Sequence, residues 1–204
     1  MLRCPGCPNQ GTKTHFVLGM PMEQPPGEVF EYNGGATQLL ASIIERASGQ
    51  GIAAFAEKNL FEPLGIEVFE WNRYPPSQIA AAPSGLRLRS KDMMKFGLLY
   101  QNHGIWEGQQ LLPAQWVEET FKAHVEKPGQ PGAYYGYQFH VLPEFSLSGK
   151  RYKLKAAIGN GDQRIYFDEE NDIMVVITAG NYNNWQTKNS LGLLKAFIYP
   201  SIFF

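Results

Sequence analysis

Cysteine is scarce in this sequence of 204 residues, where the only two are Cys4 and Cys7. A zinc site would need two further ligands, and the four histidines are dispersed without the short paired spacing that such sites use. A thioredoxin-like motif would lie between a strand and a helix, and the sequence predicts neither here. We therefore expect two incidental thiols in a loose N-terminal segment, with no metal and no cofactor.

Charge of one sign and long apolar runs are also lacking. The formal net charge is −1, and the 18 Lys and Arg residues form no basic run that could follow a phosphate backbone, so nucleic acid is not an expected partner. No apolar stretch approaches the ~20 residues of a membrane span. The first residues lack the apolar block of a signal peptide, so the compartment is unknown, with the cytoplasm as the default expectation.

The amino-acid composition is typical of one packed domain. Hydrophobic residues make up 44% of the chain and aromatic residues 13%. A chain of this length buries roughly 70% of its unfolded surface. Disordered and collagen-like classes are excluded by this composition.

The first half of the chain is expected to be mainly helical. Residues 1–29 are rich in Pro, Gly and Thr, and they predict an irregular, extended lead-in. A helix is predicted from Ala36, and Gly49 is placed to end it. Residues 66–89 contain too much Pro and Gly for a long regular element. Further helices are predicted for "IAAFAEKNLF", "KDMMKFGLLYQNHG" and "AQWVEETFKAH".

Beyond Pro131 the pattern changes to short strands rich in β-branched and aromatic residues. Residues 163–167 and 172–178 predict a hairpin over the turn "DEEN", and a closing helix is predicted at 186–198. Helices followed by antiparallel strands and a covering helix indicate an α+β fold. We therefore expect one domain at 30–204, mainly helical over 30–130 and built from strands and a terminal helix over 131–204.

Four ordered segments carry a family resemblance: "FEYNGGATQLLASIIERASGQ", "APSGLRLRSKDMMKFGLLYQNHGIWEGQQLLPAQWVEE", "YGYQF" and "GNGDQRIYFDEENDIMVVITAGNYN". Their order resembles the later portion of the serine β-lactamase-like family, which includes class C β-lactamases, D-Ala-D-Ala peptidases and related esterases. The resemblance covers residues 20–198 and implies a β-lactamase/transpeptidase-like fold.

The family uses a Ser-x-x-Lys nucleophile, a Tyr-x-Asn motif that faces it, and a Lys-Thr-Gly or His-x-Gly strand opposite. Tyr32 matches the tyrosine of the second motif, which implies a phenol that moves protons between nucleophile and leaving group. The alternative is an aromatic residue that only packs at a helix entry. Gly34 stands where the asparagine of this motif would be, so an amide contact to substrate is expected to be lost.

The third motif aligns with residues 157–159. Ala157 stands where a Lys or His is common, which leaves substrate carboxylate binding without its usual side chain. Gly159 matches the glycine that lets substrate approach the strand closely. The backbone N–H of Asn160 would then be the strand's oxyanion donor, a role that does not depend on its side chain.

The nucleophile itself is missing, because none of the nine serines is followed by lysine three residues later. The family places Ser-x-x-Lys upstream of the tyrosine motif, and only 31 residues precede Tyr32. Relative to the family, the chain is therefore expected to be N-terminally truncated and to lack the first helix and first strands of the shared sheet.

Other polar residues are expected to have ordinary roles. His103 and His140 have no Ser or Asp partner nearby in sequence, so packing or surface positions are expected. A group of acidic residues flanks the predicted turn, where a solvated surface is expected in preference to a cation site. These are Asp162, Asp168, Glu169, Glu170 and Asp172.

The sequence thus favours the C-terminal part of a β-lactamase-related serine hydrolase that would cleave a small acyl ester or amide but would not form an acyl-enzyme alone. The alternative is a non-catalytic binding or scaffold protein derived from the same fold. Strands missing from a shared sheet would expose an unpaired edge, so self-association through that edge is also expected.

Overall fold

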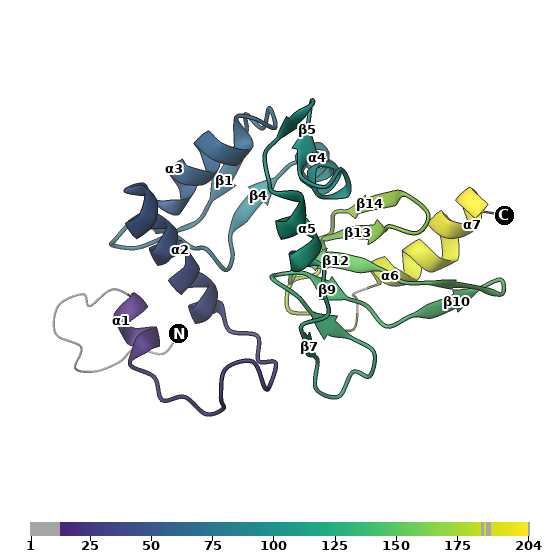
Figure 1. The fold of residues 1–204 in the computed structure, drawn as a ribbon, viewed down its shortest axis with the longest axis horizontal. Coiled ribbons are helices and arrows are strands. Elements are labelled where there is room, and N and C mark those ends of the chain that lie inside the picture. Colours follow the sequence, from purple (N-terminus) through teal and green to yellow (C-terminus); the bar gives the residue numbers. More distant parts are fainter. Residues whose placement is uncertain (1–12, 185, 187–188, 204) are drawn as a thin grey trace. The chain divides into compact units, whose positions relative to one another are not determined.

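The computed structural model describes residues 13–184, 186 and 189–203, and its chain divides into two compact units (Figure 1). Unit 1 contains residues 31–89 with the N-terminal residues up to 25, and unit 2 contains residues 26–30 and 90–204. Cys4 and Cys7 lie outside the described residues. The prediction of one domain at 30–204 is not tested by this division, and each unit is described by itself.

Unit 1 is built around one long helix. Its elements are α1 (Lys13–Leu18), α2 (Gly34–Ser48), α3 (Ile52–Ala56), the π-helical η1 (Glu57–Phe61), β1 (Phe69–Trp71), β2 (Arg73–Tyr74), β3 (Ile79–Ala80) and β4 (Leu86–Leu88). The predicted helix is confirmed as α2, and Gly49 ends it in the left-handed conformation at φ 70°. Its N–H donates to the carbonyl of Glu45, which satisfies one of the last free carbonyls of the helix.

One expectation for unit 1 is wrong. Residues 13–18 form helix α1, because the hydroxyl of Thr14 bonds that of Ser42 at 2.7 Å and Val17 lies against Gly35 of α2. Contacts with distant residues stabilise this element, which is too short to show periodicity. Residues 66–89 contain no long regular element, as predicted, only the short antiparallel strand pairs β1 with β4 and β2 with β3.

Unit 2 is an antiparallel sheet with helices on both faces. Its elements are α4 (Ser90–Gln101), β5 (Ile105–Trp106), β6 (Gln109–Gln110), α5 (Ala114–Thr120), β7 (Val125–Glu126), β8 (Tyr134–Tyr135), β9 (His140–Val141), β10 (Phe145–Leu147), β11 (Lys150–Tyr152), β12 (Lys155–Ile158), β13 (Arg164–Asp168), β14 (Ile173–Ile177), α6 (Ser190–Leu193), the π-helical η3 (Leu194–Ile198) and α7 (Tyr199–Phe203). The main sheet has the order β14-β13-β12-β9-β8-β7.

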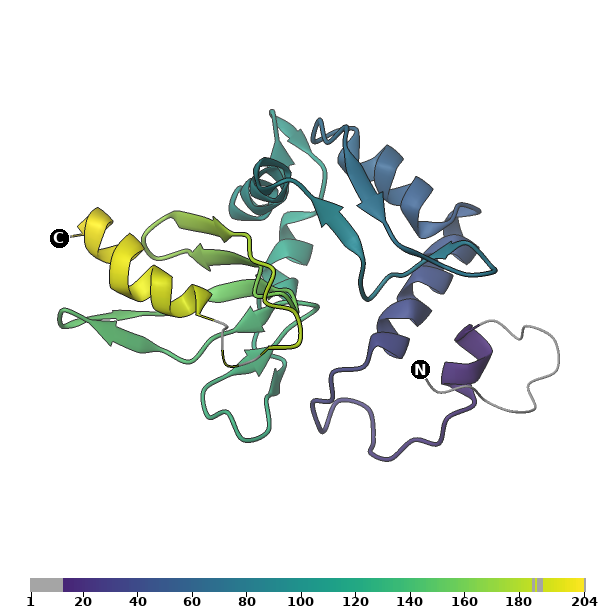
Figure 2. The ribbon, with the colours of Figure 1, turned by 180° about the vertical axis from the view of Figure 1, so that it is seen from behind.

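Successive side chains of β13 point to opposite faces of the sheet and pack in two separate cores. Ile165 and Phe167 face the side of α4 and α5, while Tyr166 faces the C-terminal helices with Leu194 and Tyr199. Beside the sheet, β10 and β11 form a hairpin that packs against the C-terminal helices (Figure 2). The α+β fold with a covering helix is confirmed, as is the predicted hairpin, which is β13 paired with β14.

The predicted boundaries need two corrections. The segment "YYGYQFHVL", which the pattern beyond Pro131 predicts as one short strand, is two strands, because the chain turns between β8 and β9 and Gln138 adopts φ 70°. The terminal helix begins at Ser190 and reaches Phe203, where residues 186–198 were expected. Within the described residues, none of the helices combines the length and the apolar character that a bilayer span requires.

A buried carboxylate fixes the start of the terminal helix. Asp162 is 2% exposed, and its oxygens accept from the N–H groups of Asn189 and Ser190 at 2.9 Å and from the Ser190 hydroxyl at 2.8 Å. An Nη of Arg164 lies 2.8 Å from the same carboxylate. The first N–H groups of a helix have no partner within it, so Asp162 satisfies donors that would otherwise be buried and unpaired.

Replacement of Asp162 should therefore be costly. We expect Asp162→Ala to lower the free energy of unfolding by about 3 kcal/mol or more, because it leaves the Arg164 guanidinium buried without its carboxylate. Glu144→Ala removes an ion pair to the exposed Arg151 and should cost less than about 1 kcal/mol. Urea unfolding followed by circular dichroism measures both, and equal losses would contradict this assignment.

The outer edge of β14 bears on self-association. No described strand pairs with that edge, and the strand sequence is the uncharged "IMVVI". Such an edge is a template for another strand, so we expect the chain to self-associate. Ile173→Lys changes a residue of neither core and should weaken the association by about tenfold. Ile202→Lys, at an exposed position of α7, is the control.

Sedimentation velocity over a range of concentrations measures this association. A sedimentation coefficient that stays monomeric at all concentrations would refute the expectation. An equal effect of the two lysine variants would place the contact elsewhere.

Candidate functional site

Tyr32 lies immediately before α2 in unit 1, at the start of the predicted second motif. Its side chain is 59% exposed. The next residue, Asn33, is the N-cap: its Oδ1 accepts from the N–H of Gly35 at 2.8 Å and of Ala36 at 3.3 Å. The cap fixes the backbone beside Tyr32 while leaving the phenol open to solvent.

Gly34 is the first residue of α2 and lies close to Pro83. A Cβ atom at this position would be 3.2 Å from the Cβ of Pro83, so an asparagine would fit only if the proline shifted. The same region is held by Gln38, whose Oε1 accepts from the N–H of Ala82 at 3.0 Å. The first turns of α2 therefore pack closely on residues 80–83.

The third-motif residues lie together in unit 2, at the end of β12. Ala157 packs against the core on the side of α4 and α5. Gly159 begins the turn to β13: its N–H donates to the carbonyl of Gln163 at 2.9 Å, and its carbonyl accepts from the backbone N–H of Asp162 at 3.1 Å. We call residues 159–163 the Gly159 turn.

Packing explains why residue 159 is glycine. A Cβ at this position would be 2.4 Å from Cδ of Gln163, whose side chain lies over Gly159 and Gly161. The Oε1 of Gln163 is buried with no hydrogen-bond partner among the described residues. The turn is therefore closed by the Gln163 side chain, which would have to shift if residue 159 carried a Cβ.

Neighbouring segments hold the Gly159 turn from both sides. Asn160 is exposed, and its Nδ2 donates to Oδ1 of Asn183 at 2.8 Å, while the N–H of Asn181 donates to the carbonyl of Gly161 at 2.9 Å. Arg164 donates to the carbonyl of Gly159 at 3.1 Å. Backbone N–H groups stabilise a developing negative charge best when their positions are fixed, and a turn held in this way fixes them.

Two acidic residues are not in the solvated turn that the sequence predicted. Asp162 and Asp168 are each 2% exposed, and Tyr199 donates to Asp168 at 2.7 Å. Burial, followed by the bond to Asp168, raises the pKa of Tyr199 well above its ordinary value. The expectation was wrong for these two because distant donors reach them, and it holds for the exposed Glu169 and Glu170.

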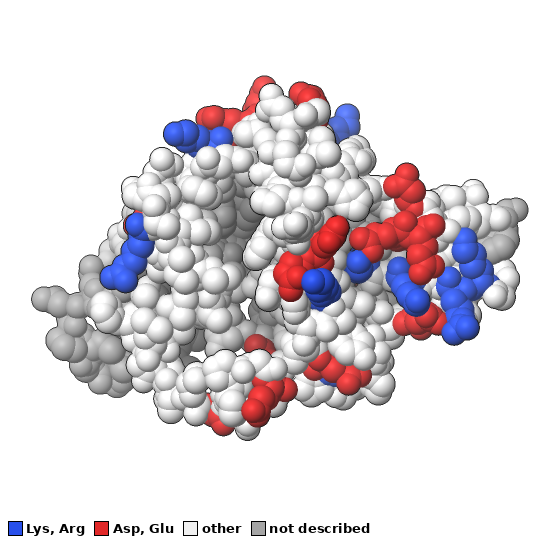
Figure 3. Space-filling view, in the orientation of Figure 1, with Lys and Arg blue, Asp and Glu red and all other residues white. Residues whose placement is uncertain are grey.

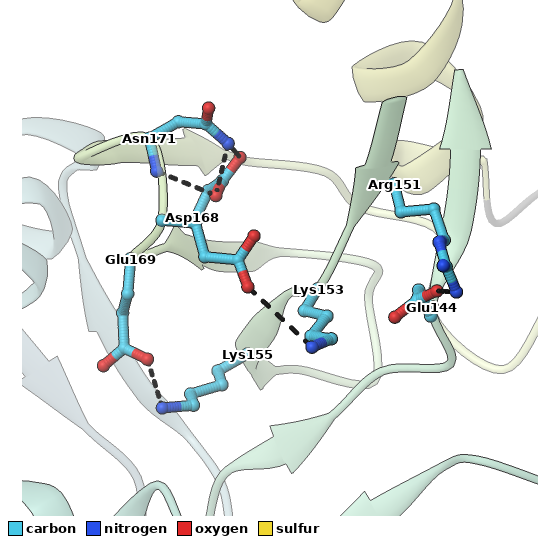
Figure 4. Close-up of polar contacts among 8 residues, drawn as sticks. Glu144, Arg151, Lys153, Lys155, Asp168, Glu169 and Asn171 are labelled. Carbon is cyan, nitrogen blue, oxygen red and sulfur yellow. Dashed lines mark hydrogen bonds and ion pairs between the residues drawn. The ribbon is translucent and has the colours of Figure 1, made fainter. Parts of the chain in front are cut away.

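Charged side chains around the turn between β13 and β14 pair with one another (Figure 4). Lys155 pairs with Glu169, and Nζ of Lys153 lies 3.9 Å from a carboxylate oxygen of Glu170. Figure 3 shows such acidic and basic residues intermingled on the visible face of unit 2. Within the described ranges, no group of three or more His, Cys, Asp or Glu residues could hold a metal ion.

The structure thus gives each half of the predicted site a defined setting. Tyr32 and Gly34 lie together in unit 1, and Ala157, Gly159 and Asn160 lie together in unit 2. The convergence of the two halves on one cleft stays a prediction. Sequence reasoning missed Gln163 and Arg164, although their place in "GNGDQR" beside the third motif was a usable signal.

Comparisons with solved structures show chains of related fold. A protein from Bacillus anthracis assigned as a 6-aminohexanoate-dimer hydrolase is 26% identical, with a TM-score of 0.70 over 89% of this chain and 45% of that one. A β-lactamase from Mycobacterium bovis is 19% identical, with a TM-score of 0.64 over 95% of this chain and 76% of that one.

Simvastatin synthase from Aspergillus terreus is 14% identical, with a TM-score of 0.68 over 94% of this chain and 61% of that one. This chain therefore spans about half to three quarters of the length of these structures. No curated protein matches the sequence. A family model described as Beta-lactamase matches residues 8–193. That match covers most of the chain, and the protein belongs to the β-lactamase family.

Proposed function

We propose that this chain forms part of a serine hydrolase that cleaves an ester or amide through an acyl-enzyme, with the attacking serine outside the 204 residues. Tyr32 would relay protons between that serine and the leaving group. The Gly159 turn would receive the acyl group, and the N–H of Asn160 would stabilise the oxyanion. The absence of Ser-x-x-Lys from the sequence is the reason for proposing a nucleophile outside it.

The observation that carries this proposal is the fixed backbone of the Gly159 turn. Its glycine carbonyl is held by Arg164, and Arg164 is held in turn by Asp162. Oxyanion stabilisation depends on donors that do not reorganise during the reaction. A turn that is braced in this way meets that requirement without the polar side chains that Ala157 and Gly34 have replaced.

The setting of Tyr32 also supports the proposal. The phenol is exposed and has no hydrogen-bond partner among the described residues. A group that is solvent-accessible and uncommitted is available for proton transfer.

A non-catalytic binding protein is the second candidate. The packing of Gly34 against Pro83 and the apolar side chain of Ala157 favour it, because neither position offers a polar contact to substrate. In that case the protein would bind a small acyl compound, a peptide or a second chain without reaction.

Acylation of the chain tests the location of the nucleophile. We expect no mass increase after incubation with a fluorophosphonate or a penicillin, because a serine without an adjacent base is a weak nucleophile. Intact-mass spectrometry is the measurement. Stoichiometric addition of one acyl or phosphonyl group would contradict the proposal.

The role of Tyr32 is tested in a gene product that extends upstream. We expect that product to carry a Ser-x-x-Lys segment whose serine is acylated. Tyr32→Phe should slow acylation by about 10²-fold to 10⁴-fold, the range of general acid–base catalysis. Tyr137→Phe, at another exposed tyrosine, should not change the rate. If the upstream sequence encodes no such segment, the non-catalytic alternative gains.

A further inference from the structure

A cavity of about 210 Å³ lies in unit 1, between helix α2, the start of α3 and the β2–β3 hairpin. Its apolar lining includes Ala41 of α2, Ile52 and Ala53 of α3, and Ile79 and Ala80 of β3. The three alanines are buried. Protein interiors are normally packed as densely as organic crystals, so three small side chains around one point leave space that larger ones would fill.

Glu45 brings a carboxylate to the edge of this apolar lining. It follows Ala41 by one helical turn and shares a face of α2 with Ala41 and Gln38. That face is turned toward the β2–β3 hairpin, because Nε2 of Gln38 donates to the carbonyl of Ala80 at 3.4 Å. Glu45 lines the cavity and has no ion-pair partner among the described residues.

Arg73 brings a guanidinium to the same cavity from the hairpin. It lies directly across from Ala80, and cross-strand partners share one face of a strand pair. One Nη of Arg73 donates to the carbonyl of Gln78 at 3.1 Å, which holds the side chain at the hairpin. Its other donors have no partner in the described part of the chain, and no carboxylate there pairs with it.

The lining indicates which ligand fits. The cavity has the volume of roughly seven water molecules at about 30 Å³ each, so one small molecule in it can reach both charged residues. A carboxylate matches the planar fork of a guanidinium, and an ammonium group matches the carboxylate of Glu45. An aliphatic body matches the alanines and isoleucines. A free α-amino acid carries all three groups on one carbon, whereas a residue inside a peptide has lost both charges to its amide bonds.

We propose that this cavity binds a free aliphatic α-amino acid, with its ammonium group at Glu45, its carboxylate at Arg73 and its side chain on the alanine lining. Glu45 comes 12 residues after Asn33, the neighbour of Tyr32, which is roughly 18 Å along α2 at about 1.5 Å per residue. The amino acid is therefore not the substrate of the proposed hydrolase, and the inference does not depend on that function.

Calorimetric titration of the intact chain with L-leucine tests the proposal. Isocaproate and isoamylamine have the same aliphatic body, but the first lacks the ammonium group and the second lacks the carboxylate. We expect leucine to bind and each analogue to bind at least about tenfold more weakly, because each loses one charge-assisted contact.

Variants at the two charged positions assign each contact. Arg73→Met and Glu45→Gln change exposed residues, and each should weaken leucine binding at least about tenfold. Arg73→Met should also bind leucine and isoamylamine alike, and Glu45→Gln should bind leucine and isocaproate alike, because the distinguishing group has lost its partner. Arg46→Met and Glu62→Gln change exposed residues outside the cavity lining and should leave binding unchanged.

A substitution in the alanine lining tests the position of the side chain. Ala80→Val fills part of the cavity and should weaken leucine binding more than alanine binding. If this variant fails to fold, the two charge variants still decide the question. The inference is overturned if neither leucine nor alanine binds, if the analogues bind as tightly as leucine, or if Arg73→Met and Glu45→Gln leave leucine binding unchanged.

Discussion

The carboxylate of Asp162 is the constraint on which the organisation of unit 2 depends. It joins three kinds of donor at one buried point: the first N–H groups of the terminal helix, the hydroxyl of Ser190 and the guanidinium of Arg164. Tyr166 extends this network through the Ser190 hydroxyl at 2.9 Å. The cover of one sheet face and the turn at the end of β12 are therefore held by the same group.

That constraint has a consequence for chemistry. A turn whose conformation is fixed by Asp162 and Arg164 does not need motif side chains to keep its shape. Gly159 leaves room for the side chain of Gln163, which lies over it, and the role proposed for Asn160 uses the backbone only. Replacement of a polar motif residue by Ala157 can then remove a substrate contact while leaving the backbone part of the site in place.

The two units also differ in the kind of group they offer. Unit 1 presents an exposed phenol at a capped helix entry, which is a group suited to proton transfer. Unit 2 presents the fixed backbone of the Gly159 turn. In the proposed hydrolase these would serve separate tasks: proton movement and oxyanion stabilisation.

The sequence by itself determined the elements whose signals are local. Helix α2 follows from a repeated apolar face and a terminal glycine, and the β13–β14 hairpin follows from two apolar runs around a polar turn. The ordered motifs also determined the family. These features depend on residues close together in the chain, so periodicity and turn chemistry suffice to find them.

Only the tertiary structure decided the rest. Helix α1 exists through contacts with α2, and Asp162 and Asp168 are buried because donors 27 to 31 residues away reach them. The contact between Nζ of Lys127 and Nδ1 of His140, at 3.5 Å, likewise needs β7, β8 and β9 to form adjacent strands. The burial of a polar group depends on partners that folding brings from far along the chain, and no local pattern of residues contains that information.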